Sequence, residues 1–96
     1  MKTFHLQIVT PNGLMFDGNA EKVIVRTIMG DVGILADHAD YVSPVASGKA
    51  KITLEGGEMR TAVCSGGLIS VRRGVTRIAA DTFEWTEELG NKNEIR

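Results

Sequence analysis

The polar side chains best suited to chemistry gather in one short segment, Asp37-His38-Ala39-Asp40. An imidazole flanked by carboxylates can ligate a metal ion or exchange protons near neutral pH. A metal site needs three or four converging ligands, however, and the chain has only two histidines and one cysteine. The sequence therefore favours a polar turn, and it keeps as the alternative an enzyme or small-ligand binder that uses Asp37, His38 and Asp40.

No other motif predicts catalysis or cofactor binding. Cys64 and His38 could form a nucleophilic pair, but Cys64 lies in a strand pattern, and free cysteines are usually buried and inert. Gly48-Lys49 lacks the other residues of a phosphate-binding loop, and Gly30-x-x-Gly33 lacks the third glycine of a dinucleotide fingerprint. A carrier domain would need a lysine at a hairpin tip, which Glu55-Gly56-Gly57-Glu58 lacks. We expect no catalytic residue, no cofactor and no metal.

Length and charge place the chain in a broad class. Its 96 residues suffice for one domain, and a net charge of −1 does not mark a nucleic-acid or anionic-membrane binder. No apolar run approaches the roughly 20 residues of a membrane span, and the N-terminus lacks the apolar core of a secretory signal. The single cysteine excludes an intramolecular disulfide. These features predict a cytoplasmic domain that binds no nucleic acid and does not insert directly into a membrane.

Hydrophobic side chains recur with a period of two along most of the chain, which is typical of half-buried strands. About nine short strands separated by turn residues predict an all-β, antiparallel sandwich or barrel. Gly30 to His38 is expected as a shaped surface loop, and Pro44 places its strand at an edge or at a bulge. Thr86 could begin a short helix that Gly90-Asn91 would stop, and residues 90–96 are expected to fray. Eight of the expected strands cover residues 4–8, 14–16, 21–28, 41–46, 49–54, 59–64, 68–71 and 75–80.

The same alternation predicts which side chains lie between the sheets. Apolar residues that alternate with polar neighbours should point inward, because that arrangement buries them while keeping charges in water. The expected core consists of Leu6, Ile8, Val23, Val25, Ile52, Leu54, Val63, Ile69 and Ile78.

A series of landmarks runs in order along the chain: Leu6-Gln7-Ile8-Val9-Thr10-Pro11-Asn12-Gly13, Phe16-x-Gly18, Glu21-Lys22-Val23, Gly30-Asp31-Val32-Gly33-Ile34-Leu35-Ala36-Asp37-His38-Ala39, Val42-Ser43-Pro44, Ser65-Gly66-Gly67 and Ile78-Ala79-Ala80-Asp81-Thr82-x-Glu84-Trp85. Taken in this order, they resemble the epsilon subunit family of the F-type rotary ATP synthases. The resemblance covers residues 4 to about 88 without gaps, and its most specific parts are the string from Gly30 to His38 and the later Ser65-Gly66-Gly67.

The resemblance implies a fold and a role. It implies a ten-stranded β-sandwich over residues 1–85, with Phe83 to Trp85 as the tenth strand. Residues 86–96 would form a short tail, where the family continues into a two-helix domain that inhibits ATP hydrolysis and in some members binds ATP. Neither ATP binding nor inhibition is therefore expected of this chain. The implied role is that of a non-catalytic rotor subunit in the central stalk, which couples proton or other ion flow to ATP synthesis.

The resemblance also implies partners and contact residues. Members of the family bind the gamma subunit and the polar loops of the c ring, at the cytoplasmic face of the bacterial cell membrane and peripheral to it. An acid at the position of Asp31 faces basic side chains of the ring. The implied c-ring contacts are Met29, Gly30, Asp31 and Val32. The implied gamma contacts are Thr10, His38, Ala39, Val42, Ser43 and Val45.

Overall fold

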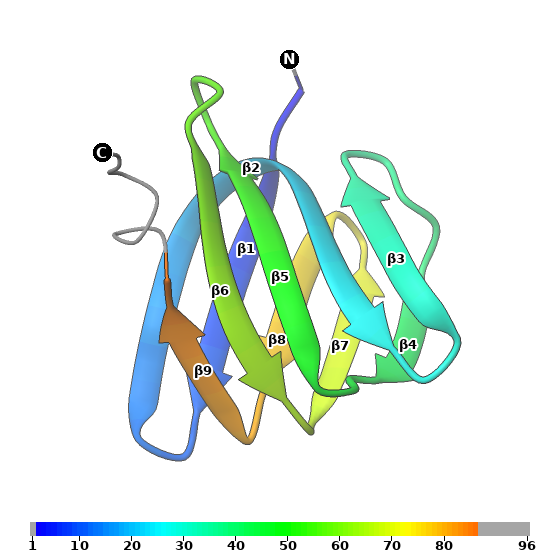
Figure 1. Ribbon diagram of the computed structural model, residues 1–96. Coiled ribbons are helices and arrows are strands. Elements are labelled where there is room, and N and C mark those ends of the chain that lie inside the picture. The colour runs from blue at the N-terminus through cyan, green and yellow to red at the C-terminus, as the bar shows by residue number, and fades with distance from the viewer. Residues whose placement is uncertain (1, 87–96) are drawn as a thin grey trace.

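The computed structural model describes residues 2–86, and this part of the chain folds into nine strands without a helix (Figure 1). The all-β prediction is therefore confirmed. The helix expected from Thr86 onward and the frayed tail at residues 90–96 lie outside the described residues, apart from Thr86 itself. The strands are β1 (Phe4–Thr10), β2 (Gly13–Thr27), β3 (Gly30–Leu35), β4 (Tyr41–Pro44), β5 (Gly48–Leu54), β6 (Met59–Ser65), β7 (Leu68–Arg72), β8 (Val75–Ala79) and β9 (Thr82–Trp85).

Two layers share the long strand β2. Its first half pairs with β1, and the hydrogen-bonded order β4-β7-β8-β1-β2 forms what we call sheet I. Its second half pairs with β3 on one side and β5 on the other, and sheet II continues through β6 to β9. The β2–β5 register shifts between Ala20 and Lys22, so Glu21 is an extra residue in β2. Such a bulge bends and twists a strand, which suits the point where β2 passes between the sheets.

The expectation of two short strands at 14–16 and 21–28 was wrong, because β2 runs through Asp17-Gly18 without a break. A Cβ on Gly18 would lie 3.2 Å from the ring of Phe16, so the glycine makes room for that ring. The predicted end of a strand before Gly18 treats this glycine as a turn residue. In the structure Gly18 lies within a strand, where its lack of a side chain allows the ring of Phe16 to pack. Counting the two halves of β2 separately gives the ten strands that the resemblance implies.

The prediction of a loop over Gly30 to His38 was also partly wrong. Residues 30–35 form β3, which pairs antiparallel with β2 from Gly30 opposite Thr27 to Leu35 opposite Lys22. Only the segment after Leu35 turns, with Asp37 at a φ of 69°. One strand pair also departs from the antiparallel prediction, since β1 and β8 run parallel.

Two further turns lie at pairs of adjacent glycines. Gly56 and Gly57 join β5 to β6 with φ values of 96° and 95°, a backbone that glycine adopts without steric cost. Gly66 and Gly67 carry the chain from β6 in sheet II to β7 in sheet I. β4 ends sheet I, which confirms the edge position that Pro44 predicts.

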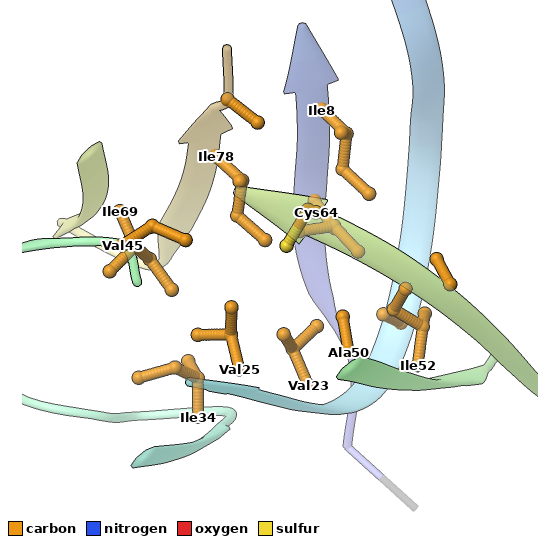
Figure 2. Close-up of a cluster of buried hydrophobic side chains, with 14 of the residues drawn as sticks. Ile8, Val23, Val25, Ile34, Val45, Ala50, Ile52, Cys64, Ile69 and Ile78 are labelled. Carbon is orange, nitrogen blue, oxygen red and sulfur yellow. The ribbon is translucent and has the colours of Figure 1, made fainter. Parts of the chain in front are cut away.

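The core lies between the two sheets, and side chains from both point into it (Figure 2). Seven of the nine expected core residues are buried, and Leu54 packs partly buried against them. Val63 was assigned to the wrong face: it is 40% exposed, and β6 buries Ala62 and Cys64 instead. The fully buried side chains that fill the centre include Leu6, Ile8, Val23, Val25, Ile34, Ile52, Ile69 and Ile78.

Candidate interaction surfaces

The three polar residues of the alternative hypothesis do not form one site. The Asp37 carboxylate pairs with Lys2 at 2.6 Å, while Asp40 accepts a hydrogen bond from the backbone N–H of Arg73 at 3.1 Å. The Nδ1 atom of His38 lies 2.7 Å from the carbonyl oxygen of Ala39. Within residues 2–86, no three His, Cys, Asp or Glu side chains are grouped so that they could hold a metal ion. The segment is a polar turn whose members each have their own partner.

Cys64 is a core residue. Its side chain is 4% exposed, and burial raises the pKa of the thiol above its ordinary value because a thiolate is poorly solvated there. A nucleophilic cysteine needs the opposite shift. The pairing of Cys64 with His38 that the sequence leaves open therefore has no electrostatic support.

The four residues implied to contact the c ring lie in the β2–β3 hairpin, with Met29 and Gly30 at its tip and Asp31 and Val32 behind it on β3. Ile28 and Met29 form its two-residue turn, because Thr27 pairs with Gly30. The Thr27 hydroxyl donates to the carbonyl of Gly30 at 2.8 Å and accepts from the N–H of Met29 at 3.1 Å. Gly30 has a φ of 107°. The tip is thus fixed from within, while Ile28 and Met29 are 65% and 86% exposed.

Beside the tip, Asp31 lies on the exposed outer surface of sheet II. Its Oδ1 atom is 2.6 Å from Nε of Arg26, its cross-strand neighbour on β2. Arg26 donates a hydrogen bond to the Asp31 carboxylate, and this bond, followed by the negative charge of the carboxylate, raises the pKa of Arg26. Val32 is half-buried and packs against the core. The structure therefore places the carboxylate of Asp31 and the guanidinium of Arg26 next to an exposed apolar tip.

The six residues implied to contact gamma occupy two separate segments. Thr10 ends β1, where its hydroxyl accepts a hydrogen bond from the N–H of Asn12 at 3.1 Å. The other five follow β3: two lie in the turn, two in β4, and Val45 directly after β4. The ring of His38 packs edge-on against Tyr41, with centroids 5.8 Å apart, and Ala39 is exposed.

Within the second segment, only some of the side chains reach the surface. Val42 is 62% exposed, whereas Ser43 and Val45 are 6% and 5% exposed. Ser43 lies opposite Ile69 on the inward face of sheet I. A partner on the outer face would therefore meet Val42 and Pro44, while Ser43 and Val45 hold the segment to the core.

Sequence reasoning missed several exposed apolar residues. Leu14, Leu68 and Val75 are 57%, 50% and 45% exposed on sheet I. The sequence holds a signal for Leu68, and for the outward residues Val9 and Ala79, since β1, β7 and β8 each contain two adjacent apolar residues. Neighbouring strand residues point to opposite faces, so each pair must place one apolar side chain outward. These pairs are Ile8-Val9, Leu68-Ile69 and Ile78-Ala79.

No helix in the part of the chain that the structure describes is long and apolar enough to cross a membrane. Residues 3–86 match the family described as ATP synthase, Delta/Epsilon chain, beta-sandwich domain. The ATP synthase epsilon chain of Alkaliphilus metalliredigens is 45% identical over 86 residues, which cover 90% of this chain and 63% of that protein. The epsilon chain of Propionigenium modestum, named as sodium ion specific, is 46% identical over 81 residues, which cover 84% of this chain and 58% of that protein. The chain thus spans less than two thirds of the length of these relatives.

Solved structures show the same fold. A chain in the mitochondrial ATP synthase of Euglena gracilis, solved as an OSCP/F1/c-ring assembly, superimposes with a TM-score of 0.83 and 27% identity, covering 91% of this chain and 56% of that one. A chain of the Tetrahymena thermophila central stalk and c ring shares the fold at a TM-score of 0.73 and 16% identity, covering 97% of this chain and 75% of that one. By its sequence match over residues 3–86, this chain belongs to the ATP synthase delta/epsilon family, and its strands form that family's β-sandwich domain.

Proposed function

We propose that this protein is a non-catalytic rotor subunit of an F-type ATP synthase, which joins the gamma subunit to the c ring and so couples ion flow to ATP synthesis. The observation that carries the proposal is the family match over residues 3–86. A relative of 27% identity lies in an assembly of F1 with a c ring. The proposed place is the cytoplasmic face of a bacterial membrane, peripheral to the bilayer.

The c-ring contact is assigned to the β2–β3 tip. Exposed apolar residues such as Met29 lose unfavourable contact with water when a partner covers them. The Asp31 carboxylate, held on the same hairpin by Arg26, supplies a negative charge for basic side chains of the ring. Such a charge at an interface rim mainly sets the rate and orientation of docking.

The gamma contact is assigned to the end of β1 and the outer face of β4. Val42 is exposed there, and β4 is an edge strand of sheet I. An edge strand has unpaired backbone groups that a partner can cover. Thr10 adds a second point of contact from β1.

β2 belongs to both proposed contacts. It begins at Gly13, which pairs with Thr10 on the gamma side, and it ends at Thr27, which pairs with Gly30 on the ring side. Movement of the ring contact would therefore reach the gamma contact through one continuous strand.

Cysteine crosslinking in the assembled enzyme tests the proposal. Val42→Cys should crosslink efficiently to gamma because its side chain is exposed, and Ser43→Cys should crosslink less efficiently because that position is buried. Native Cys64 is buried and gives little background. Val63→Cys, exposed on the outer face of sheet II, is the matched control and should not reach gamma. Crosslinks from Val42→Cys to stator subunits alone would refute the rotor assignment.

A further inference from the structure

A hollow of about 460 Å³ lies on the outer face of sheet II, across β3, β2 and β5 (Figure 1). Gly48 lets the stem of Arg26 lie close to β5, because a Cβ on that glycine would be only 2.9 Å from the Cβ of Arg26. We call this feature the basic hollow. Its lining residues are Ile24, Arg26, Asp31, Gly48, Lys49 and Lys51.

Three cations and one acid line the basic hollow. Asp31 pairs with Nε of Arg26 at 2.6 Å, so these two charges largely neutralise each other. Lys49 and Lys51 are exposed, and within residues 2–86 neither of them forms an ion pair with a carboxylate. They lie two residues apart on β5, so both point to the same side of the sheet. The hollow therefore carries an excess of positive charge, although the whole chain has a net charge of −1.

Protection of a sheet edge does not account for the two lysines. Lysines on edge strands prevent unwanted pairing with another chain, but β5 is an interior strand, with β2 on one side and β6 on the other. Two like charges on one strand also repel each other. A ligand with negative charge would relieve that repulsion.

The neighbouring surface indicates what kind of anion fits. Arg26 and Asp31 are the first cross-strand pair behind the β2–β3 tip, where Ile28 and Met29 are exposed. Protein surfaces that bind at a membrane interface combine such apolar side chains with lysines and arginines, which attract the phosphates of anionic lipids. A soluble anion would use the cations and leave the apolar tip in water. The combination of tip and hollow favours a lipid.

We propose that the basic hollow binds the phosphate of an anionic phospholipid headgroup at the membrane surface. The choice of the membrane rests on the proposed function, because a ring contact at the same tip brings the hollow close to the bilayer. Lys49 and Lys51 pair with the phosphate oxygens. Arg26 keeps its Nε bond to Asp31 and offers its two terminal nitrogens. The contact is peripheral and adds to the attachment that the ring provides.

Co-sedimentation of the whole 96-residue chain with vesicles tests the proposal. Vesicles that contain phosphatidylglycerol should bind the chain, and vesicles of phosphatidylcholine alone should not. Binding should weaken as salt is raised, because exposed charges are screened. The double variant Lys49→Glu with Lys51→Glu should bind at least about tenfold more weakly. Ile28→Ser should bind at least about threefold more weakly, because it removes an apolar side chain from the interface.

The matched control is the double variant Arg72→Glu with Arg77→Glu. It changes the net charge by the same amount, but its exposed side chains lie on β7 and β8 of sheet I. Because charges farther from the bilayer than the screening length contribute little, it should change binding less than about twofold. Equal losses in the two double variants, with both folded by circular dichroism, would show that only net charge matters and would overturn the proposal.

Two further outcomes separate the alternatives. If inorganic phosphate shifts the amide resonances of Lys49 and Lys51 but the vesicles do not bind the chain, the hollow takes a soluble anion and the lipid proposal is overturned. Crosslinking of Val42→Cys to gamma is measured independently. If that crosslink forms while vesicle binding fails, the lipid proposal fails and the proposed function stands. If the crosslinks go to stator subunits alone, the proposed function fails, and with it the reason for choosing a membrane.

Discussion

Arg26 and Asp31 face each other across the β2–β3 hairpin, with Nε 2.6 Å from Oδ1. They are the first cross-strand pair behind the tip, directly after Thr27 and Gly30. The pair fixes the carboxylate next to the exposed turn instead of leaving it to sample solvent. A basic group approaching the tip would therefore find an oriented acceptor that already has one cationic partner.

Reversing this charge should loosen the proposed ring contact. Asp31→Arg removes the acceptor and places two guanidinium groups side by side, so we expect a roughly two- to tenfold loss of affinity for the c ring at low salt. The loss should shrink as ionic strength rises, because exposed charges are screened. Ring binding measured at two salt concentrations checks both statements. Glu58→Arg is the matched control, since Glu58 is exposed at the β5–β6 turn, at the other end of the molecule in Figure 1. Equal loss in both variants would remove any special role for Asp31.

Truncation of Ile52 tests the core. Its side chain is fully buried on β5, so Ile52→Ala should lower the free energy of unfolding by about 2–5 kcal/mol, from lost burial and the cavity left behind. Urea titration measures the change. Val63→Ala removes apolar atoms from the solvent-facing side of β6 and should cost less than about 1 kcal/mol. A near-neutral Ile52→Ala would contradict the face assignment of β5.

Gly67 should be among the least replaceable residues. Its φ is 88°, and a Cβ there would collide with the carbonyl oxygen of Ala79. Gly57 has a similar φ of 95° but open space around it. Gly57→Ala should therefore cost only the left-handed backbone strain, about 1–2 kcal/mol, and Gly67→Ala clearly more. Thermal melts of the two variants compare them directly, and equal losses would show that the collision is relieved without cost.

The Cys64 thiol should be protected from reagents in the folded protein. It should also make the free energy of unfolding fall at high pH. Because burial raises its pKa in the folded state, the unfolded chain loses this proton at a lower pH than the folded chain does. The free energy of unfolding should therefore decrease as pH rises above the ordinary thiol pKa of about 8.5. Cys64→Ala should lack that part of the decrease. A thiol reagent should react with the native protein at least about 100-fold more slowly than with the unfolded chain, and rapid native labelling would contradict the burial.

The strands that sequence patterns located correctly are those in which apolar and polar residues alternate. In β1, Leu6 and Ile8 alternate with His5 and Gln7, so the face is unambiguous. In β6 the pattern Ala62-Val63-Cys64 has no polar contrast, and choosing the larger side chain gave the wrong face. The small residues point inward because they lie beside Trp85 and Phe83 of β9, whose rings fill the space. That neighbour relation is tertiary, and no local pattern contains it.

Glycines caused two other errors, the break expected in β2 and the loop expected over β3, because a glycine has several structural uses. Gly18 and Gly33 lie within strands, whereas Gly13 and Gly30 have the positive φ values of turns. A local sequence pattern does not distinguish these two uses of glycine. For the contact residues, the resemblance supplied their positions, but which of them reach solvent depends on the strand pleat. Val42 is exposed and Ser43 is buried for that reason alone.

The uninterrupted course of β2 has a mechanical consequence for the proposed assembly. Its second half is flanked by β3 and β5, so a pull along the strand loads many backbone hydrogen bonds in shear at once. No flexible linker interrupts the backbone between Gly13 and Thr27. In a drive shaft built of elastic parts in series, the softest part stores most of the strain energy. A domain braced in this way is a stiff part, so the twisting of each rotary step would be stored in its partners.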